Sequence, residues 1–233
     1  MRIFTANIKH TMRPGRVASD IRHAIHLGGI GIWQEIETKH SKAVLAGAAA
    51  KAGLDVHCIE TECPITVNRR RWVVERDNVH LMHKGRFLIT PHRVTSEVRA
   101  HRRSADHAKL CVLATHMLSS AWSTRAMSTR KWRRRMWHIH YRKLQALIRR
   151  AHEDGYTVIV GLDANKGVRS MRFHPDQIIV SAHGIDGIIV VPAKGTRTTH
   201  GRERVIRGLF TDHDPVTVDV TLATRRRRAP NLP

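Results

Sequence analysis

The most informative stretch of the sequence is Tyr156-Thr-Val-Ile-Val-Gly-Leu-Asp163-Ala-Asn165. Its first five residues have strong β-strand propensity and lead to a glycine. Because alternate residues of a strand point to the same side, the polar side chains of Asp163 and Asn165 can face one site. A second acidic segment, Thr211-Asp212-His213-Asp214-Pro215, follows near the C-terminus. Polar groups gathered at strand ends are typical of enzyme sites built on a rigid scaffold.

Strands and helices alternate around this stretch. We expect strands at 2–8 and 30–33, and helices at 15–27, 42–52 (with Ser41 as its N-cap) and 131–152. Residues 54–113 instead contain short β-like runs at 55–59, 71–75, 86–90 and 110–114, which favour an antiparallel meander. Further strands are expected at 177–181, 187–191 and 216–222. This order predicts a layered α/β protein, and two packed sheets with outer helices would fit it.

The chain is strongly basic. Its 233 residues include 41 Lys and Arg against 19 Asp and Glu, so the formal net charge is +22 with the histidines neutral. A field of this sign attracts polyanions, which favours nucleic acid as the partner, followed by an anionic membrane surface. Arginine outnumbers lysine, which fits bidentate phosphate binding but equally fits a GC-rich genome. The length fits one catalytic domain at residues 1–223, followed by a disordered basic tail at 224–233.

Cysteine usage and hydropathy bear on the cellular compartment. Cys58, Cys63 and Cys111 form no pair of CxxC motifs, and the sequence shows no signal peptide, so reduced thiols in the cytoplasm are expected. No apolar stretch approaches the roughly 20 residues that a membrane helix requires. We therefore expect a cytoplasmic monomer that does not associate with a membrane.

Polar residues recur where apolar strands are expected to end. They are Asn7, Glu35, His116, Asp163, Asn165, Asp186, Asp212 and His213. Carboxylate and amide oxygens are ligands for hard cations such as Mg²⁺, Mn²⁺ or Ca²⁺. Mg²⁺ usually takes one or two carboxylates, which leaves the other groups to handle water and phosphate. Each residue also has a structural interpretation, as a turn residue, a surface acid or a buried structural histidine.

Six short motifs containing these residues span positions 5–216. They are Thr5-Ala-Asn7, Trp33-Gln34-Glu35, Ala114-Thr115-His116, Gly161-Leu-Asp163-Ala-Asn165, Ile185-Asp186-Gly-Ile188 and Thr211-Asp212-His213-Asp-Pro215-Val. In this order they resemble the motifs of the endonuclease/exonuclease/phosphatase superfamily, the DNase I-like metal-dependent phosphoesterases. The resemblance implies a four-layer α/β sandwich of two mixed, mainly antiparallel sheets flanked by helices. It places the site at one edge of the two facing sheets.

The same resemblance implies how a metal and a water molecule are handled. Glu35 resembles the principal metal-binding carboxylate, with Asn7 beside it, and Asp212 resembles the acid that holds either the imidazole of His213 or a metal. Asp163 resembles the acid that orients or activates the attacking water, and Asn165 resembles its partner on the phosphate. The implied cofactor is Mg²⁺ or Mn²⁺.

The histidines follow from the same resemblance. His213 resembles the histidine that contacts the scissile phosphate or the nucleophile, and His116 resembles a central histidine near the leaving group. Asp186 resembles the acid that supports a histidine. Which histidine acts as acid and which as base is left open. The tyrosine motif of the abasic-site endonuclease branch is not evident in the sequence, which makes abasic-site repair a weaker interpretation.

A basic and aromatic run lies at the start of the longest expected helix. In Lys131-Trp-Arg133-Arg134-Arg135-Met136-Trp137, cations alternate with large apolar groups, a pattern typical of phosphate contact with base stacking. Because positions 132 and 136 are one helical turn apart, we assign the aromatic residues to packing and Arg133, Arg134 and Arg135 to phosphate. Arg69 and Arg70 extend the basic surface. Each run is equally compatible with a solvated face.

These observations favour a metal-dependent nuclease that hydrolyses phosphodiester bonds of DNA through attack by an activated water. A phosphatase or phosphodiesterase acting on small phosphoesters or phospholipid headgroups is the alternative within the enzymes. A non-catalytic nucleic-acid-binding relative is the alternative outside them. The choice between DNA and RNA, and between endonuclease and exonuclease activity, is not decided by the sequence.

Overall fold

Two β-sheets form the centre of the computed structural model, which describes residues 1–9, 11–86, 90–104, 108–122 and 129–224. The first sheet contains β1 (Arg2–Asn7), β2 (Ile30–Gln34), β3 (Leu54–His57), β4 (Ile65–Asn68), β11 (Thr196–His200), β12 (Arg204–Val205) and β13 (Val216–Thr224). The second contains β5 (Trp72–His83), β6 (Arg93–Arg102), β7 (Lys109–His116), β8 (Thr157–Asp163), β9 (Ile178–His183) and β10 (Asp186–Val191). Their strand orders are β11-β13-β1-β2-β4-β3, with β12 also on β13, and β5-β6-β7-β8-β10-β9.

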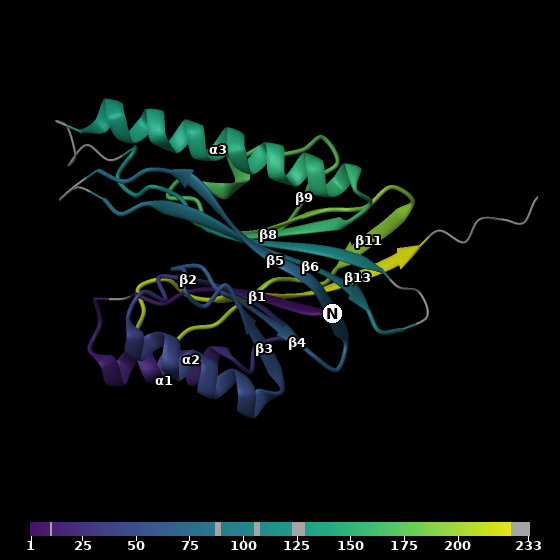
Figure 1. Cartoon of the computed structure of the whole chain (residues 1–233), viewed down its shortest axis with the longest axis horizontal. Helices are drawn as coiled ribbons and strands as arrows, with labels where there is room; N and C mark the ends of the chain where they lie inside the picture. The colour runs from purple at the N-terminus through teal and green to yellow at the C-terminus, as the bar shows by residue number, and fades with distance from the viewer. Residues whose placement is uncertain (10, 87–89, 105–107, 123–128, 225–233) are drawn as a thin grey trace, which may run out of the picture.

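Helices cover the outer face of each sheet (Figure 1). The helices α1 (Pro14–Ala24) and α2 (Lys39–Ala52) lie on the first sheet, and the long helix α3 (Arg130–Glu153) lies on the second. A short 3-10 helix, η2 (Val168–Ser170), follows β8. The expected four-layer sandwich of two mixed sheets is therefore confirmed. Both sheets are mainly antiparallel, with one parallel pair in each, β1 with β2 and β7 with β8.

Strand alternation builds three apolar cores between the four layers. In β1, Ile3 packs between the two sheets, whereas its neighbour Phe4 packs under α1 and α2. In β8, Ile159 faces the first sheet, whereas Val158 and Val160 pack under α3. Both faces of these central strands are buried, which explains their nearly continuous apolar sequences.

Two β-α-β units set the position of the polar strand ends. α1 connects the parallel strands β1 and β2, and α3 connects the parallel strands β7 and β8. The carboxyl ends of parallel neighbours lie at the same edge of a sheet. The two sheets approach closely at Gly161, where an added Cβ would lie 2.5 Å from a methyl group of Ile32. This close packing brings the two polar edges together at the end of the molecule opposite Met1 (Figure 1).

Some expected elements are corrected by the structure. α2 begins one turn earlier than expected, because Thr38 and not Ser41 is the N-cap. The Thr38 hydroxyl accepts a hydrogen bond from Ser41 N at 3.0 Å, and Ser41 Oγ accepts one from Thr38 N at 3.1 Å. The run expected at 86–90 forms an isolated bridge between Arg86 and Thr90, and its middle lies outside the described residues. Strands β4, β6, β11 and β12 were not expected.

Three further expectations concern the cysteines, membrane helices and the C-terminal tail. All three cysteines are buried and free. Within the described residues, no helix has both the length and the apolar character that crossing a membrane requires. The basic tail expected at 224–233 lies outside the described residues from position 225 onward.

Candidate active site

Side chains from both sheets converge where β1, β2, β7 and β8 end. Asn7, His116 and Asp163 are the last residues of β1, β7 and β8, and Glu35 directly follows β2. His116 and Asp163 are register partners. β10 runs antiparallel to β8, so its first residue, Asp186, pairs with Asp163 at the same edge. β13 runs antiparallel to β1, so His213, which precedes β13, also reaches this edge.

Asn7, Glu35, His116 and Asp163 form the first of two overlapping clusters. Asn7 Nδ2 donates to Asp163 Oδ2 at 2.9 Å and to Glu35 Oε1 at 3.2 Å. His116 Nε2 lies 3.6 Å from Asp163 Oδ2 and 4.0 Å from Glu35 Oε1. One ligand atom each of Glu35, His116 and Asp163 lies within 4.8 Å of the others, so together these residues can hold a metal ion. Asn7, His116 and Asp163 are buried, whereas Glu35 is partly open to solvent.

The backbone turns sharply at two of these strand ends. Glu35 and Asn165 have positive φ angles of 61° and 48°. Side chains other than glycine are uncommon in this region, and such conformations concentrate at functional sites. Asn165 N donates to Asp163 Oδ1 at 2.9 Å, and Asn165 Nδ2 donates to Met117 O at 2.9 Å. The turn therefore fixes the Asp163 carboxylate, while the Asn165 side chain is held against the segment after His116.

Asp186 and His213 form the second cluster, which shares Asp163 with the first. His213 Nδ1 lies 2.7 Å from Asp186 Oδ2. The hydrogen bond to the Asp186 carboxylate raises the pKa of His213 to about 9, although burial acts in the opposite direction. Burial raises the pKa of Asp186, and the hydrogen bond to His213 opposes that rise. The imidazole is consequently protonated at neutral pH and directs one N–H to Asp186.

Glu62 and Arg93 support His116 from behind, and the sequence did not indicate either residue. His116 Nδ1 lies 3.4 Å from Glu62 Oε2 and 3.2 Å from Arg93 Nη1, and the Glu62 and Arg93 side chains form a buried ion pair. Burial opposes the charge on Glu62, but His116 and Arg93 together lower its pKa to about 2. Burial likewise opposes the charge on His116, yet the Glu62 carboxylate raises the pKa of that ring above its ordinary value.

Unpaired oxygens at the site fit a bound cation. Among the described residues, Asn7 Oδ1 and Asp186 Oδ1 are buried and have no hydrogen-bond partner. Buried polar atoms in proteins are normally satisfied, so such oxygens call for a ligand, an ion or a water. The carboxylates and amide suit Mg²⁺, and the addition of an imidazole is also compatible with Mn²⁺.

Asp212 is not brought into either cluster. Its carboxylate is exposed and forms an ion pair with Lys9, with Nζ 2.6 Å from Oδ2. Burial works against this charge, but the hydrogen bond to Lys9 lowers the pKa of Asp212. The preceding loop is fixed by Asp20 of α1, which accepts hydrogen bonds from the backbone N–H groups of Phe210 and Thr211. The assignment of Asp212 as a metal ligand stays a prediction.

The two expected basic surfaces lie at opposite ends of the sandwich. Arg133 Nη1 and Arg134 Nε donate to the carbonyls of Ser119 and Ala121, in the segment that follows His116. Arg135 is exposed on the same first turns of α3. Arg69 and Arg70 lie in the turn between β4 and β5, and Arg70 lines a cavity of about 450 Å³ beside Met1. Of these two basic surfaces, the one on α3 therefore contacts the segment that follows His116.

Solved structures similar to this chain share a single fold. No protein-family model and no curated protein matches the sequence. The TDP2 structure from D. rerio in complex with a single-strand DNA product has a TM-score of 0.68 at 13% identity, covering 95% of this chain and 98% of that chain. The mannosyl-6-phosphatase of Bacteroides thetaiotaomicron has a TM-score of 0.70 at 12% identity, covering 95% and 99%. An endonuclease/exonuclease/phosphatase family protein of the same species has a TM-score of 0.71 at 12% identity, covering 95% and 97%.

Proposed function

The chain has the DNase I-like fold of the endonuclease/exonuclease/phosphatase superfamily, and on this premise we propose that it is a metal-dependent nuclease that hydrolyses phosphodiester bonds of DNA. One observation carries the proposal: an amide, three carboxylates and two histidines from both sheets meet at one edge, in Asn7, Glu35, Asp163, Asp186, His116 and His213. Structural ion pairs rarely require so many buried polar groups at the ends of apolar strands.

Glu35 and Asn7 are the residues that would hold Mg²⁺ or Mn²⁺, with Asp163 within reach of the same ion. Such an ion neutralises phosphate charge and lowers the pKa of a bound water. The carboxylate of Asp163 is fixed through both oxygens, by Asn7 and by the backbone of Asn165, and is therefore well placed to orient a water and accept its proton.

The histidines supply positive charge and protons to the reacting phosphate. In hydrolysis, the water oxygen forms a bond to phosphorus, the bond to the leaving oxygen breaks, and that oxygen takes up a proton. His213 is protonated at neutral pH through its pairing with Asp186, so it can donate to a phosphate oxygen. His116, whose pKa is raised by Glu62, can protonate the leaving oxygen.

DNA is the proposed substrate because of charge. The net charge of +22 favours a polyanion over a small phosphoester, and arginines of α3 contact the segment that follows His116. The D. rerio structure with a single-strand DNA product shows that this fold can bind such a chain in that protein. The buried free cysteines fit the proposed cytoplasmic location.

Hydrolysis of small phosphoesters is the second candidate, favoured by the similarity to the mannosyl-6-phosphatase. Plasmid, linear duplex and single-stranded DNA, a chromogenic phosphodiester and a chromogenic phosphomonoester are each incubated with protein in Mg²⁺, Mn²⁺ or EDTA. We expect metal-dependent DNA cleavage that is lost in Glu35→Gln and Asp163→Asn and kept in Asp55→Asn, which alters an exposed carboxylate away from the site. Turnover of a chromogenic phosphoester without cleavage of DNA would favour an enzyme acting on small phosphoesters. DNA binding without cleavage by the wild-type protein would favour a non-catalytic relative.

A further inference from the structure

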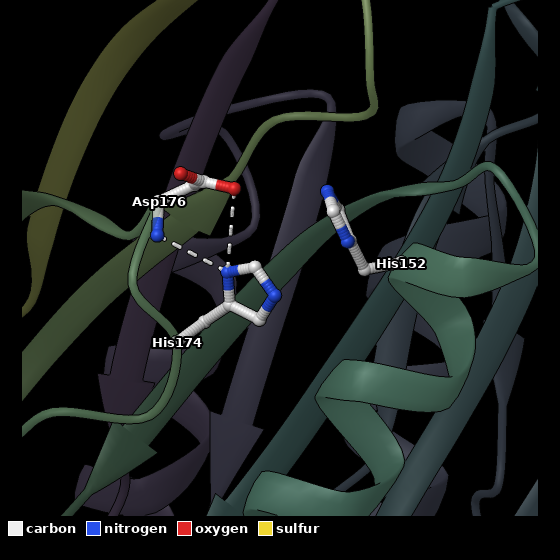
Figure 2. A group of neighbouring side chains, drawn as sticks. All are labelled: His152, His174 and Asp176. Atoms are coloured by element: carbon white, nitrogen blue, oxygen red, sulfur yellow. Dashed lines mark hydrogen bonds and ion pairs between the residues drawn. The ribbon is translucent and has the colours of Figure 1, made fainter.

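Two histidines and an aspartate lie close together outside the active site, where the end of α3 meets the segment between η2 and β9 (Figure 2). His152 is in the last turn of α3, and His174 and Asp176 belong to the segment that leads into β9. The helix rises about 1.5 Å per residue, so His152 lies roughly 28 Å along α3 from Arg133. This cluster is therefore separate from the proposed catalytic residues.

The geometry of the cluster suits a shared ligand. The rings of His152 and His174 have centroids 4.5 Å apart and are tilted by 57°. A ring nitrogen of each histidine and a carboxylate oxygen of Asp176 all lie within 4.8 Å of one another. His174 Nδ1 lies 3.9 Å from Asp176 Oδ2 and accepts a hydrogen bond of 3.2 Å from Asp176 N, as Figure 2 shows. The His152 ring makes no hydrogen bond to another described residue, and it packs against the ring of His174.

The segment that carries His174 is held firmly against α3. Gln145 Nε2 donates to Arg172 O at 2.9 Å, and Tyr141 Oη accepts from Arg172 N at 3.1 Å. Gln177 Oε1 accepts from His174 N at 3.2 Å, which closes the turn around the histidine. The position of His174 relative to His152 is thus fixed by contacts that do not involve either ring.

The chemistry of these ligands selects the cation. Two imidazoles and one carboxylate are a common zinc ligand set, whereas Mg²⁺ is bound mainly by oxygen. Zinc bonds of about 2.0–2.1 Å in a tetrahedral site place ligand atoms about 3.3 Å apart, so ligand atoms that lie within 4.8 Å of one another must move closer together when the ion binds. Asp176 can supply part of this movement because its side chain is 69% exposed, and rotation of the imidazole rings supplies the rest. Water can take the fourth position.

We propose that His152, His174 and Asp176 bind Zn²⁺ and tie the end of α3 to the segment before β9. The site joins two parts of the outer layer, so a bound ion stabilises the folded protein through its affinity for that state. The proposal does not depend on phosphoesterase activity. Its residues also differ in burial, since His152 is buried, His174 partly buried and Asp176 exposed.

Zinc binding is measured by isothermal titration calorimetry on the full chain without a histidine tag. The catalytic cluster also contains histidine and carboxylate, so Asp163→Asn is titrated in parallel. We expect one zinc site to be lost in His174→Gln, a different one in Asp163→Asn, and both in the double variant. Zinc affinity at the proposed site should fall on the order of tenfold or more in Asp176→Asn. His200→Gln, an exposed histidine outside the cluster, should bind like wild type.

A thermal melt provides the second measurement. Zn²⁺ should raise the melting temperature of wild type and of Asp163→Asn, and the rise should be smaller in His174→Gln and Asp176→Asn. Asp176 is exposed, so we expect Asp176→Asn to retain the fold. If His174→Gln is unstable without metal, the thermal shift of Asp176→Asn decides whether the cluster binds zinc. Equal zinc stoichiometry and equal thermal shifts in wild type and in both cluster variants would overturn the proposal, as would an equal loss in His200→Gln.

Discussion

At the scale of single residues, the buried ion pair behind His116 is the feature with the largest expected energetic effect. Glu62→Gln leaves the Arg93 guanidinium buried without its countercharge, with side-chain exposures of 10% for Glu62 and 7% for Arg93 in the wild type. Breaking a buried pair by removing one partner costs about 3–5 kcal/mol. Denaturant unfolding should show this loss of stability, and Glu60→Gln, two residues away and exposed, should change stability little.

The same pair predicts a pH dependence. The pKa of Glu62 is lowered to about 2 in the folded protein, from an ordinary value of 4.5. Its stabilising contribution is therefore fully present above about pH 4.5 and is lost as the pH falls through about 2. Thermal melts between pH 2 and 7 should show the difference between wild type and Glu62→Gln narrowing across this range. A constant difference would mean that packing, and not charge, explains the effect of the substitution.

The Asp186–His213 pair predicts a shift in the opposite direction. The folded-state pKa of His213 is raised to about 9, so this pair stabilises the protein fully below pH ~6.5 and loses its effect as the pH rises through about 9. In Asp186→Asn the pKa of His213, followed by NMR of the imidazole in metal-free protein, should fall toward about 6.5. Asp55→Asn serves as the control, and an unchanged His213 titration in Asp186→Asn would contradict the assignment.

At the scale of elements, the close contact between β8 and β2 determines how near the two sheets come. The Cβ of Gly161→Ala would meet three atoms of the fully buried Ile32 at 2.5, 2.6 and 2.8 Å. Overpacking of this kind costs about 1–3 kcal/mol. Gly47→Ala in α2 is the matched control, because nothing lies within 4 Å of the added Cβ, and it should stabilise by about 0.5–1 kcal/mol. Chemical denaturation of both variants tests the difference in sign.

Elements with strong apolar patterns were predicted well from the sequence. β1, β2, β8 and α3 appear near their expected positions because both faces of these strands, or one stripe of this helix, are buried. β6 was missed because one face of this strand carries Glu97 and Arg99. These two side chains are buried and form an ion pair with each other. The inner face of β6, with Val98 and Ala100, carried an alternating signal that the charges obscured.

The site shows the same division between local and long-range information. Asn7, Glu35, His116, Asp163 and Asp186 lie at the ends of strands or directly after one, where a change from apolar to polar residues is visible in the sequence. The contact of Arg93 with Glu62 joins residues 31 positions apart in different elements, so no local pattern indicates it. Ser41 was expected to cap α2 for a related reason: Thr38 and Ser41 are both capping residues, and only the three-dimensional turn distinguishes N-cap from N3.

At the scale of the whole molecule, the position of the positive charge predicts how DNA is bound. Arg134→Glu/Arg135→Glu and Arg69→Glu/Arg70→Glu change the net charge equally, but only the first pair lies beside the proposed site. We expect the first double variant to lower kcat/KM on DNA more than the second. It should also reduce the slope of log affinity against log salt by roughly 2, about 0.9 for each lost phosphate contact.

Two comparisons control this experiment. Neither double variant should alter turnover of a small chromogenic phosphodiester, because its single charge needs no extended basic surface. Equal losses on DNA in both double variants would instead show that the overall field, and not a defined surface on α3, attracts the substrate.

The pairing of β1 with β13 has a consequence for how the protein is made. β1 lies between β2 and β13, and Arg2 pairs with Asp219, 217 residues further along the chain. Thr211 Oγ1, just before β13, also donates to the carbonyl of Asn7 at 2.8 Å. Contacts of such long sequence separation form slowly, and a ribosome adds only about 5–20 residues per second. The first strand can therefore complete its pairing only after the last strand has been synthesised, and until then the carbonyl of Asn7 lacks its hydrogen bond from Thr211.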